Sequence, residues 1–214
     1  MSLKRRNRKS NAIPVIGLIG GVASGKSFVA QALEELGCAC INADKVGHEL
    51  LDNPMIKLQL RKAFGELIFS QDGKVNRSRL GGIVFGNDEL ATDNLMQLNS
   101  IMHPAMRAAI VRDVIRLRQA KPAPPAIVLD AALLLEANWD KACDWIFFVD
   151  TPEPIRRQRA LMRGWSESHW QSREKAQVGL DAKRKAATHF IPGDADEASL
   201  RRKLERLLAE LAPQ

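Results

Sequence analysis

Residues 17–28, which read GLIGGVASGKSF, constrain the fold of this chain more than any other segment. A continuous apolar run over residues 15–19 leads into the glycines and has the length and composition of a strand buried on both faces. Over residues 26–36 the apolar side chains recur instead at helical spacing, and Gly37 is well placed to end that helix. The segment therefore predicts a buried strand, a tight glycine-rich turn and a helix in immediate succession.

The turn matches the phosphate-binding pattern G-x-x-x-x-G-K-[ST], the P-loop. Its glycines let the backbone curl so that successive N–H groups point at phosphate oxygens, and the helix N-terminus adds its positive dipole end. Lys26 would reach the outer phosphates, and Ser27 would hold Mg²⁺. A glycine-rich turn with an exposed lysine is the alternative, but the strand before it and the helix after it favour nucleotide binding. We expect contacts to a nucleoside triphosphate from Gly20, Gly21, Ala23, Ser24, Gly25, Lys26, Ser27 and Phe28.

Further strands and helices follow along the chain. Apolar runs of strand length lie at residues 38–42, 126–129 and 145–149. Helical patterns occupy residues 45–118, 155–186 and about 197–211. Strands that alternate with helices predict an α/β fold with a doubly wound parallel sheet, here a three-layer P-loop NTPase fold.

The positive charge of the chain is concentrated at its start. Of the formal net charge of +7, five positive charges lie in the first nine residues. Such a segment could contact nucleic acid or acidic lipid, but no aromatic residue interleaves with the charges. We therefore expect residues 1–12 to form a disordered, solvated basic tail, and we expect no nucleic-acid partner.

Hydropathy and cysteine content are typical of a cytoplasmic protein. The sequence has no run of 18 or more apolar residues, so we expect no membrane span, and the basic start lacks the apolar segment of a secretory signal. The sequence has three cysteines, too few for a disulfide framework: Cys38, Cys40 and Cys143. Cys38 and Cys40 lack the second pair of ligands that a zinc site would need. We expect a cytoplasmic protein that makes no membrane contact.

Two aspartates follow expected strands, at the edge where an open α/β sheet binds its ligands. Asp44 comes after the second strand and could orient an acceptor hydroxyl or accept its proton; alternatively, it caps a helix that starts at Lys45. Asp130 ends the third strand and could hold Mg²⁺ through water, although a turn residue at a strand end is an equally open interpretation. Transfer of a phosphoryl group to a hydroxyl needs carboxylates of this kind.

Arginines gather in the segment after the fourth strand. They are Arg156, Arg157, Arg159, Arg163 and Arg173. Arg159 and Arg163 are four residues apart and would share one face of a helix. Arginines on a mobile helix could close over the phosphates and neutralise charge in the transition state, whereas a solvated charged face is the alternative for any single one. We expect residues 152–186 to form a cationic lid, with Arg163 as the catalytic cation and Arg159 as a nucleotide contact.

Several motifs together resemble the dephospho-coenzyme A kinase family, which phosphorylates the ribose 3′-hydroxyl of dephospho-CoA. The resemblance covers residues 14–211. It rests on GGVASGKS in the loop, INADKVGHELL around Asp44, LNSIMHP with His103 and Pro104, VLDAALLLE around Asp130, and Arg159, Arg163, Arg173 and Gln177 in the expected lid. No single motif decides the matter, but their order and spacing are specific.

The resemblance implies an enzyme that uses ATP with Mg²⁺ and phosphorylates dephospho-CoA, with Asp44 as the base beside Lys26 and Arg163. A helical insert over residues 45–118 would bind the acceptor. Its candidate ligands are Asp44, Arg77, Arg79, His103 and Arg107. His103 could instead cap a turn before Pro104. The P-loop core would comprise residues 13–44, 119–151 and 187–214, and we expect a monomer or weak homo-oligomer.

The chain departs from the pattern of that family at several positions. Ala23 stands where glycine is usual, which is tolerable if its φ angle is negative. Asn42 replaces the first aspartate of an Asp-Ala-Asp motif, and Ala132 replaces a proline. Thr188 and Gly193 stand where an aspartate and an asparagine near the adenine are usual. We therefore expect altered adenine contacts and looser selectivity for the nucleotide base.

Two other functions fit parts of the sequence. Another P-loop kinase, acting on a nucleoside or nucleotide, would share the loop and the lid and differ in its acceptor groove. A nucleic-acid-stimulated P-loop ATPase would respond to DNA or RNA with a steep salt dependence, and only the basic tail encourages that hypothesis. A kinase would hydrolyse little ATP until a hydroxyl acceptor fills the closed site.

Overall fold

The computed structural model describes residues 12–85 and 90–211, so the expected basic tail lies, except for its last residue, outside the described part. The chain divides into two compact units. One comprises residues 1–42 with 113–214 and contains the sheet, and the other comprises residues 43–112 and is helical. We call them the sheet unit and the helical unit.

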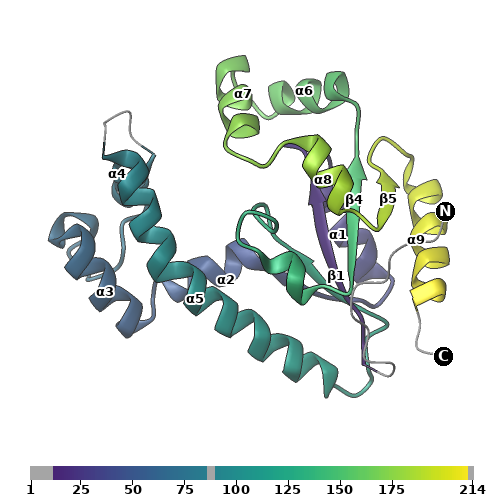
Figure 1. The fold of residues 1–214 in the computed structure, drawn as a ribbon, viewed down its shortest axis with the longest axis horizontal. Helices are drawn as coiled ribbons and strands as arrows, with labels where there is room; N and C mark the ends of the chain where they lie inside the picture. The colour runs from purple at the N-terminus through teal and green to yellow at the C-terminus, as the bar shows by residue number, and fades with distance from the viewer. Residues whose placement is uncertain (1–11, 86–89, 212–214) are drawn as a thin grey trace. The chain divides into compact units, whose positions relative to one another are not determined.

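The sheet unit is built on parallel strands in the spatial order β2-β3-β1-β4-β5, of which β1, β4 and β5 are labelled in Figure 1. The strands are β1 (Val15–Gly20), β2 (Ala39–Asn42), β3 (Ile127–Asp130), β4 (Trp145–Asp150) and β5 (His189–Pro192). The first four confirm the strands expected from the sequence, and the parallel sheet with its helices confirms the α/β fold. The prediction missed β5, because its four residues alternate between buried and exposed and end in a proline, so that they form no continuous apolar run.

All carboxyl ends of these strands lie along one edge of the sheet, because the strands are parallel. In the register of the sheet, Leu18 of β1 and Asn42 of β2 are the neighbours of Asp130 on its two sides. The glycine-rich loop follows β1 at Gly20. The loop and Asp130 therefore share the edge at which open α/β sheets bind ligands.

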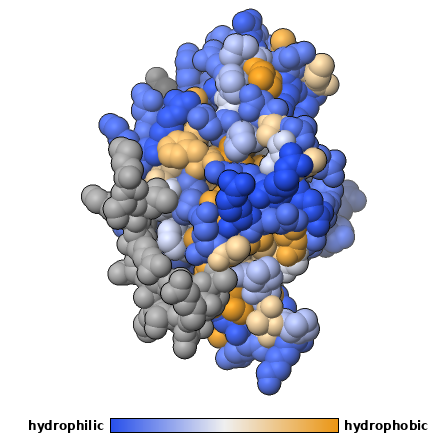
Figure 2. Space-filling model, turned by 90° about the vertical axis from the view of Figure 1, so that its right-hand side faces the viewer, coloured by the Kyte–Doolittle hydropathy of each residue, from blue (hydrophilic) through white to orange (hydrophobic). Residues whose placement is uncertain are grey.

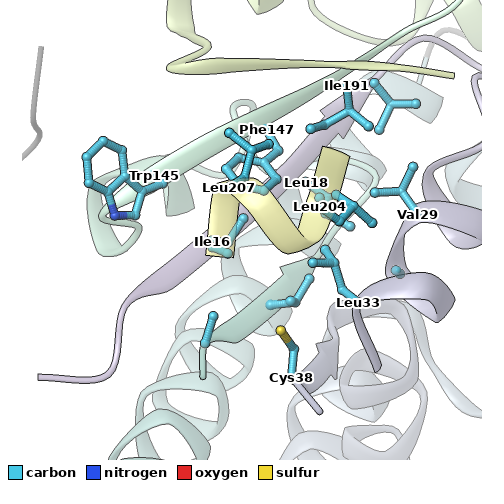
Figure 3. Packing of buried hydrophobic residues seen from close by; sticks show 14 of the residues in the cluster. Ile16, Leu18, Val29, Leu33, Cys38, Trp145, Phe147, Ile191, Leu204 and Leu207 are labelled. Atoms are coloured by element: carbon cyan, nitrogen blue, oxygen red, sulfur yellow. The ribbon is translucent and has the colours of Figure 1, made fainter. Parts of the chain in front are cut away.

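Helices α1 (Lys26–Glu35) and α9 (Glu197–Leu211) contribute to one buried core with the sheet. This core includes Ile16, Leu18, Val29, Leu33, Phe147, Leu204 and Leu207 (Figure 3). The leucine stripe of α9 is thus buried, as its spacing predicts. α1 ends at Glu35, and Gly37 follows two residues later with a φ angle of +87° and an N–H that donates to the Glu34 carbonyl at 2.8 Å, as suits a glycine that stops a helix.

The arginine-rich segment, residues 152–186, is helical as its pattern predicts. It forms three separate helices and not one continuous helix. They are α6 (Glu153–Met162), α7 (Glu167–Lys175) and α8 (Leu180–Ala186), as drawn in Figure 1. Ala160 of α6 and Trp170 of α7 are buried together with Val22 of the glycine-rich loop. The first two of these helices therefore pack directly against the loop. A short 3-10 turn, η2 (Trp139–Ala142), precedes β4.

The helical unit has its own core. Its elements are α2 (Ala43–Leu50), α3 (Pro54–Phe64), the 3-10 turn η1 (Glu66–Ile68), α4 (Arg77–Val84) and the larger part of α5 (Ala91–Arg118). Asn53 caps α3, because its side-chain oxygen accepts the N–H of Met55 at 2.9 Å. The buried residues of this core are Ile56, Leu60, Ile68, Phe69, Leu80, Val84 and Met102.

The surface is mainly hydrophilic on the face drawn in Figure 2, where hydrophobic residues are interspersed among hydrophilic ones. Exposed apolar side chains such as Met55 and Leu67 occur on the helical unit. Within residues 12–85 and 90–211, no helix combines the length and the apolar character that a bilayer span would need.

The three cysteines are free thiols. Cys38 and Cys143 are buried, and burial raises the pKa of the Cys38 thiol to about 11. Burial also raises the pKa of the Cys40 thiol, with the nearby Glu34 carboxylate as a second cause. Both groups therefore stay protonated near neutral pH and are poor nucleophiles.

Candidate active site

The glycine-rich loop has the backbone conformation that its sequence predicts, with one correction. Gly25 precedes α1 with a φ angle of +96°, in the left-handed region that glycine adopts without steric cost. Ala23 also has a positive φ angle, +60°, so the condition under which an alanine was expected to be tolerable is not met. Ala23 thus adopts a backbone conformation that suits glycine, at a steric cost of about 1–2 kcal/mol.

Lys26 and Asp130 form an ion pair at the carboxyl edge of the sheet. Lys26 Nζ lies 3.0 Å from Asp130 Oδ1, and each side chain is less than one-fifth exposed. Asp130 is therefore more than a turn residue at the end of β3, because it holds the ammonium group of the loop lysine. A lysine held in this way has a fixed orientation at the sheet edge, with its ammonium group beside the glycine-rich loop.

Asp44 lies in the first turn of α2, two residues beyond the end of β2. The helix begins at Ala43, so Asp44 is inside it and is not the residue that precedes it, where a capping side chain stands. The interpretation of Asp44 as a helix cap is thus wrong. Its side chain is exposed to solvent.

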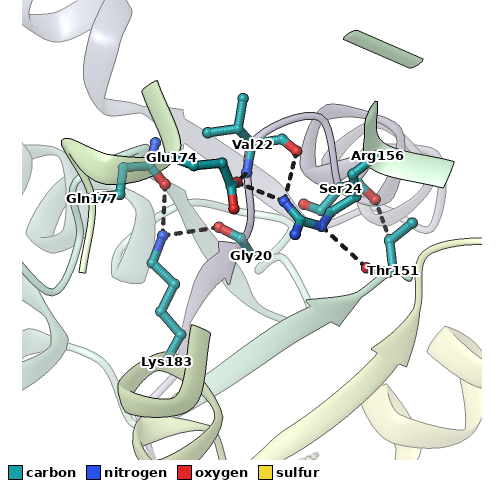
Figure 4. A network of polar contacts seen from close by, with 8 residues as sticks. All are labelled: Gly20, Val22, Ser24, Thr151, Arg156, Glu174, Gln177 and Lys183. Carbon is teal, nitrogen blue, oxygen red and sulfur yellow. Dashed lines mark hydrogen bonds and ion pairs between the residues drawn. The ribbon is translucent and has the colours of Figure 1, made fainter. Parts of the chain in front are cut away.

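Arg156 is buried, which corrects its interpretation as a cation that closes over the phosphates. Only 1% of this residue is exposed, and its guanidinium lies against the glycine-rich loop (Figure 4). It donates to the carbonyls of Thr151 at 3.2 Å and Val22 at 3.3 Å, and to Glu174 Oε1 at 2.6 Å. A β-carbon built on Gly21 would lie 2.6 Å from this guanidinium. Arg156 is therefore part of the support of the loop.

A second buried cation, Lys183 of α8, supports the start of the loop. Its Nζ donates to the Gly20 carbonyl at 3.0 Å and to Gln177 Oε1 at 2.6 Å (Figure 4). Burial lowers the pKa of Lys183, while the carboxylates of Glu136 and Glu174 act in the opposite direction. Gln177, which the family resemblance places in an expected lid, thus accepts a hydrogen bond from Lys183 of the same segment.

The remaining arginines differ in what they contact. Arg159 donates to the Ser24 carbonyl at 3.2 Å, so it reaches the loop, whereas Arg163 is exposed at the end of α6. Arg157 pairs with Glu167 at 2.6 Å on the surface, and the guanidinium of Arg173 stacks on the Trp165 ring at 4.6 Å. Arg157 therefore fits the alternative of a solvated charged face. Arg159 instead contacts the glycine-rich loop.

Thr188 and Gly193 have structural roles. The Thr188 hydroxyl accepts the N–H of Ile146 at 2.9 Å and so ties β5 to β4. A β-carbon on Gly193 would overlap the Thr151 hydroxyl and lie 2.6 Å from the Ser24 carbonyl. No larger residue fits at Gly193 in this backbone, because the chain there packs directly against the glycine-rich loop.

The candidate acceptor residues lie in the helical unit. Arg77 is the first residue of α4, and His103 and Arg107 are four residues apart on α5, on one helical face. α5 continues through Pro104, so the alternative that His103 caps a turn is wrong. Burial lowers the pKa of His103.

Arg79 is engaged within the helical unit. Its guanidinium donates at 3.2 Å to the carbonyls of both Leu67 and Phe69, beside the 3-10 turn η1. These bonds connect α4 to the preceding turn. Of the arginines that were named as candidate acceptor ligands, Arg79 is therefore the least suited to that role.

The donor chemistry at the sheet edge fits Mg²⁺. Ser27 offers a hydroxyl at the start of α1, and Asp130 a carboxylate at the end of β3. Mg²⁺ prefers such oxygen ligands and takes the rest of its shell from water and substrate phosphates. The described residues contain no group of three or more histidine, cysteine or acidic side chains that could form an all-protein metal site.

Sequence reasoning missed the roles of Glu174 and Thr151 at the loop. Glu174 Oε1 accepts the Val22 N–H at 2.6 Å, and the Thr151 hydroxyl donates to the Ser24 carbonyl at 2.7 Å. Glu174 lies in a segment dense in charge, where no local pattern separates an inward carboxylate from a solvated one. Thr151 follows a buried strand directly, which was the one usable signal.

Comparison with known proteins agrees with this geometry. The family model described as dephospho-CoA kinase matches residues 14–198. The dephospho-CoA kinase of Carboxydothermus hydrogenoformans is 37% identical over 199 residues, which span 92% of this chain and 93% of the relative. That of Rhodopirellula baltica is 33% identical over 198 residues, spanning 92% and 91%.

Solved structures agree with the sequence relatives. A crystal structure from Thermus thermophilus has a TM-score of 0.79 at 28% identity and covers 94% of this chain and 100% of its own. The dephospho-CoA kinase of Campylobacter jejuni has a TM-score of 0.62 at 25% identity and covers 94% and 98%. On these matches, which span nearly the whole sequence, the chain belongs to the dephospho-CoA kinase family.

Proposed function

We propose that this enzyme transfers the γ-phosphoryl group of ATP to the ribose 3′-hydroxyl of dephospho-CoA, the last step of coenzyme A biosynthesis. The Lys26–Asp130 pair, at the carboxyl edge of the sheet and at the start of the P-loop helix, is the observation that carries the proposal. Family membership over residues 14–198 supports the identity of the acceptor. We also propose a cytoplasmic enzyme that acts as a monomer or weak homo-oligomer.

ATP would be held mainly by the glycine-rich loop. The Val22, Ser24 and Phe28 N–H groups donate to Glu174 and to the Gly21 and Gly25 carbonyls. The other backbone N–H groups of the loop would face the phosphate oxygens, with the positive end of the α1 dipole behind them. Lys26 would exchange its bond with Asp130 for one with the outer phosphates. Because the ammonium group is already at the sheet edge, little reorganisation would be needed when the nucleotide binds.

Ser27 and Asp130 would hold Mg²⁺ beside the phosphates. Bound there, the ion would neutralise phosphate charge and fix the orientation of the transferred group. The move of Lys26 toward the phosphates would free the Asp130 carboxylate for this role. Ala23 and Ser24 would contribute loop backbone to the same phosphate site, although the conformation of Ala23 costs energy.

Asp44 would orient the ribose hydroxyl and accept its proton. Its carboxylate is exposed in the first turn of α2 and is thus available to a substrate. Residues 45–118 would provide the acceptor-binding insert, with Arg77, Arg107 and His103 as the polar contacts. Arginine suits this task because its planar fork binds phosphate oxygens in pairs.

Residues 152–186 would act as the lid, with Arg163 as its catalytic cation. Arg163 is exposed at the end of α6 and is thus free to meet charge that develops in the transition state. Arg159 would hold ATP from the same helix, since it already touches the Ser24 carbonyl of the loop.

A coupled assay of ADP release tests the proposal. MgATP is supplied in separate reactions with dephospho-CoA, with adenosine, with AMP and without any acceptor. Adenosine and AMP are also added to the reaction with dephospho-CoA as competing acceptors. Turnover that depends on dephospho-CoA, with a product phosphorylated at the 3′ position, is the expected result.

Other outcomes of this assay identify the alternatives. Turnover with adenosine or AMP alone would indicate a nucleoside or nucleotide kinase and overturn the assignment of the acceptor. ADP release that needs no acceptor and rises with DNA or RNA would indicate a nucleic-acid-stimulated ATPase.

A further inference from the structure

The backbone of the glycine-rich loop is held from behind by side chains of the lid helices (Figure 4). Lys183 binds the Gly20 carbonyl, Arg156 binds the Val22 carbonyl, and Arg159 binds the Ser24 carbonyl. Three cations, from α6 and α8, thus each bind one carbonyl of the loop. Bonds of this kind hold the loop backbone curled, and within a curled loop the Ser24 N–H donates to the Gly21 carbonyl while the remaining N–H groups can converge on a phosphate.

Glu174 of α7 is the exception, because it binds an N–H group of the loop. Its Oε1 accepts the Val22 N–H at 2.6 Å and, at the same distance, the buried guanidinium of Arg156. Arg156 in turn donates to the carbonyl of the same residue, Val22. The ion pair therefore holds the peptide groups on both sides of Val22, one through its donor and one through its acceptor.

We propose that Glu174 and Arg156 are positioning residues for the proposed reaction: together they fix the Val22 backbone so that the rest of the loop is shaped for the phosphates of ATP. Neither needs to touch the substrate for this role. Glu174 acts through its accepting oxygen, and Arg156 supplies the charge that keeps this carboxylate at the loop. The proposal rests on ATP being the nucleotide of the proposed function.

Steric detail supports a positioning role. A β-carbon on Gly21 would lie 2.6 Å from the Arg156 guanidinium, so the loop backbone is in direct contact with its support. Trp170 of α7 packs with Val22 in the same buried cluster, and the guanidinium lies 5.7 Å from its ring centroid. A contact network this tightly packed transmits a displacement of Glu174 directly to the loop.

The chain offers a matched control. Arg157 and Glu167 also join α6 to α7 through an ion pair of 2.6 Å, but their side chains are 54% and 36% exposed. That pair joins α6 to α7 on the surface, and within residues 12–85 and 90–211 neither side chain is hydrogen-bonded to the loop. Glu167→Ala therefore removes an ion pair between the same helices and leaves the loop support intact.

Equilibrium binding of MgATP, measured by calorimetry without any acceptor, tests the proposal. We expect Glu174→Ala to weaken ATP binding by about tenfold, because the Val22 N–H loses its acceptor. Glu174→Gln keeps an accepting oxygen at the same reach and is expected to bind ATP within about twofold of the wild type. Glu167→Ala is expected to leave ATP binding unchanged.

Thermal unfolding separates positioning from a merely structural role. Both Glu174→Ala and Glu174→Gln leave the buried guanidinium of Arg156 without its counter-charge, so both are expected to lower Tm. Only the alanine variant is expected to lose ATP affinity. If that variant does not fold, Glu174→Asp serves in its place, because it keeps the charge but shortens the reach to Val22.

Three results would overturn the proposal. The first is unchanged ATP affinity in both Glu174→Ala and Glu174→Asp. The second is a loss of ATP affinity in Glu174→Gln as large as that in Glu174→Ala. The third is tighter ATP binding in any Glu174 variant, which would mean that the carboxylate competes with phosphate. Because the binding measurement needs no acceptor, it remains informative even if the wild type shows no turnover with dephospho-CoA. Failure of the positioning role and failure of the proposed function are therefore distinguishable.

Discussion

The carboxylate of Asp130 lies 3.0 Å from the ammonium group of Lys26, and this ion pair joins the end of β3 to the first residue of α1. Both side chains are largely screened from water. A charge in such a position has few alternative partners, so each of the two determines where the other lies. The pair therefore provides the first test of the proposed mechanism.

Replacement of Asp130 by asparagine keeps the shape of the side chain and removes its charge. We expect kcat to fall by about 100-fold, because Lys26 and the metal lose a charged partner that matters most in the transition state. The Mg²⁺ concentration for half-maximal activity should rise as well. Steady-state kinetics over a Mg²⁺ titration measures both effects.

Asp150 supplies the control for that substitution. It ends β4, a strand of the same sheet that is separated from β3 by β1, and it pairs with the exposed Arg184 at 3.0 Å. Asp150→Asn is expected to keep kcat within about threefold of the wild type. Equal losses in the two variants would remove the special role of Asp130.

Asp44→Asn tests the base. We expect ATP affinity to stay near that of the wild type and kcat to fall by about 100-fold or more, because only proton transfer and hydroxyl orientation are lost. Rapid-quench kinetics with dephospho-CoA measures the rate, and calorimetry measures ATP binding. Asp52→Asn, an exposed position near the end of the same helix, is the control. Normal turnover in Asp44→Asn would exclude Asp44 from the mechanism.

Ala23→Gly tests the strain in the loop. The φ angle of Ala23 is +60°, so removal of its β-carbon is expected to stabilise the protein by about 1 kcal/mol, even after the greater entropy of an unfolded glycine. Ala32→Gly, inside α1, is expected to act in the opposite direction by about 1 kcal/mol. Urea unfolding of both variants measures these changes. A loss of stability in Ala23→Gly would contradict the loop conformation.

Gly193→Ala tests the contact between the end of β5 and the glycine-rich loop. Because a β-carbon there would overlap the Thr151 hydroxyl, we expect a loss of about 1–3 kcal/mol in the free energy of unfolding and weaker ATP binding. Gly179→Ala meets no atom within 4 Å at a φ angle of −58° and is expected to change stability by less than about 0.5 kcal/mol. A fully stable Gly193→Ala variant would show that the loop can move away.

His189 makes stability depend on pH. It is buried between the rings of Trp145 and Phe147, and burial lowers its pKa below the usual 6.5, with Glu210 and Lys203 acting in opposite directions. Below pH 6.5 the unfolded chain therefore binds a proton that the folded chain resists, so stability is lost as the pH falls from 6.5 toward the lowered pKa.

Unfolding in urea between pH 7 and pH 5 measures this dependence. His189→Phe is expected to reduce the loss of stability over this range, because the titrating group is gone. His48→Gln, an exposed position on α2, is expected to leave the dependence as it is. A pH dependence that is unchanged in His189→Phe would assign the effect to other groups.

Local patterns account for the elements that the sequence predicts well. The strands β1 to β4 are continuous apolar runs, and α9 carries a leucine stripe at helical spacing, so a few neighbouring residues suffice to identify them. β5 escapes the same reasoning because it is a short strand at the edge of the sheet, with alternate residues exposed. The order of the strands depends on pairing between distant segments and has no local signal.

The candidate site divides in the same way. Glycines, a lysine and a serine in fixed succession identify the phosphate loop because every part of that chemistry lies within eight residues. The left-handed conformation of Ala23 could not be predicted, since an alanine ordinarily avoids it. The burial of Arg156 and Lys183 was equally hidden in a segment whose charge density suggested a solvated face or a mobile lid.

The sequence by itself determined the phosphate loop, the alternation of strands and helices and, through the order of its motifs, the family. Only the tertiary structure decided which charges support the loop. Glu174 and Val22 are 152 residues apart in the chain, and Asp130 and Lys26 are 104 apart. A buried charge is stable only beside a partner that satisfies it, and whether such a partner is within reach depends on how distant segments pack together.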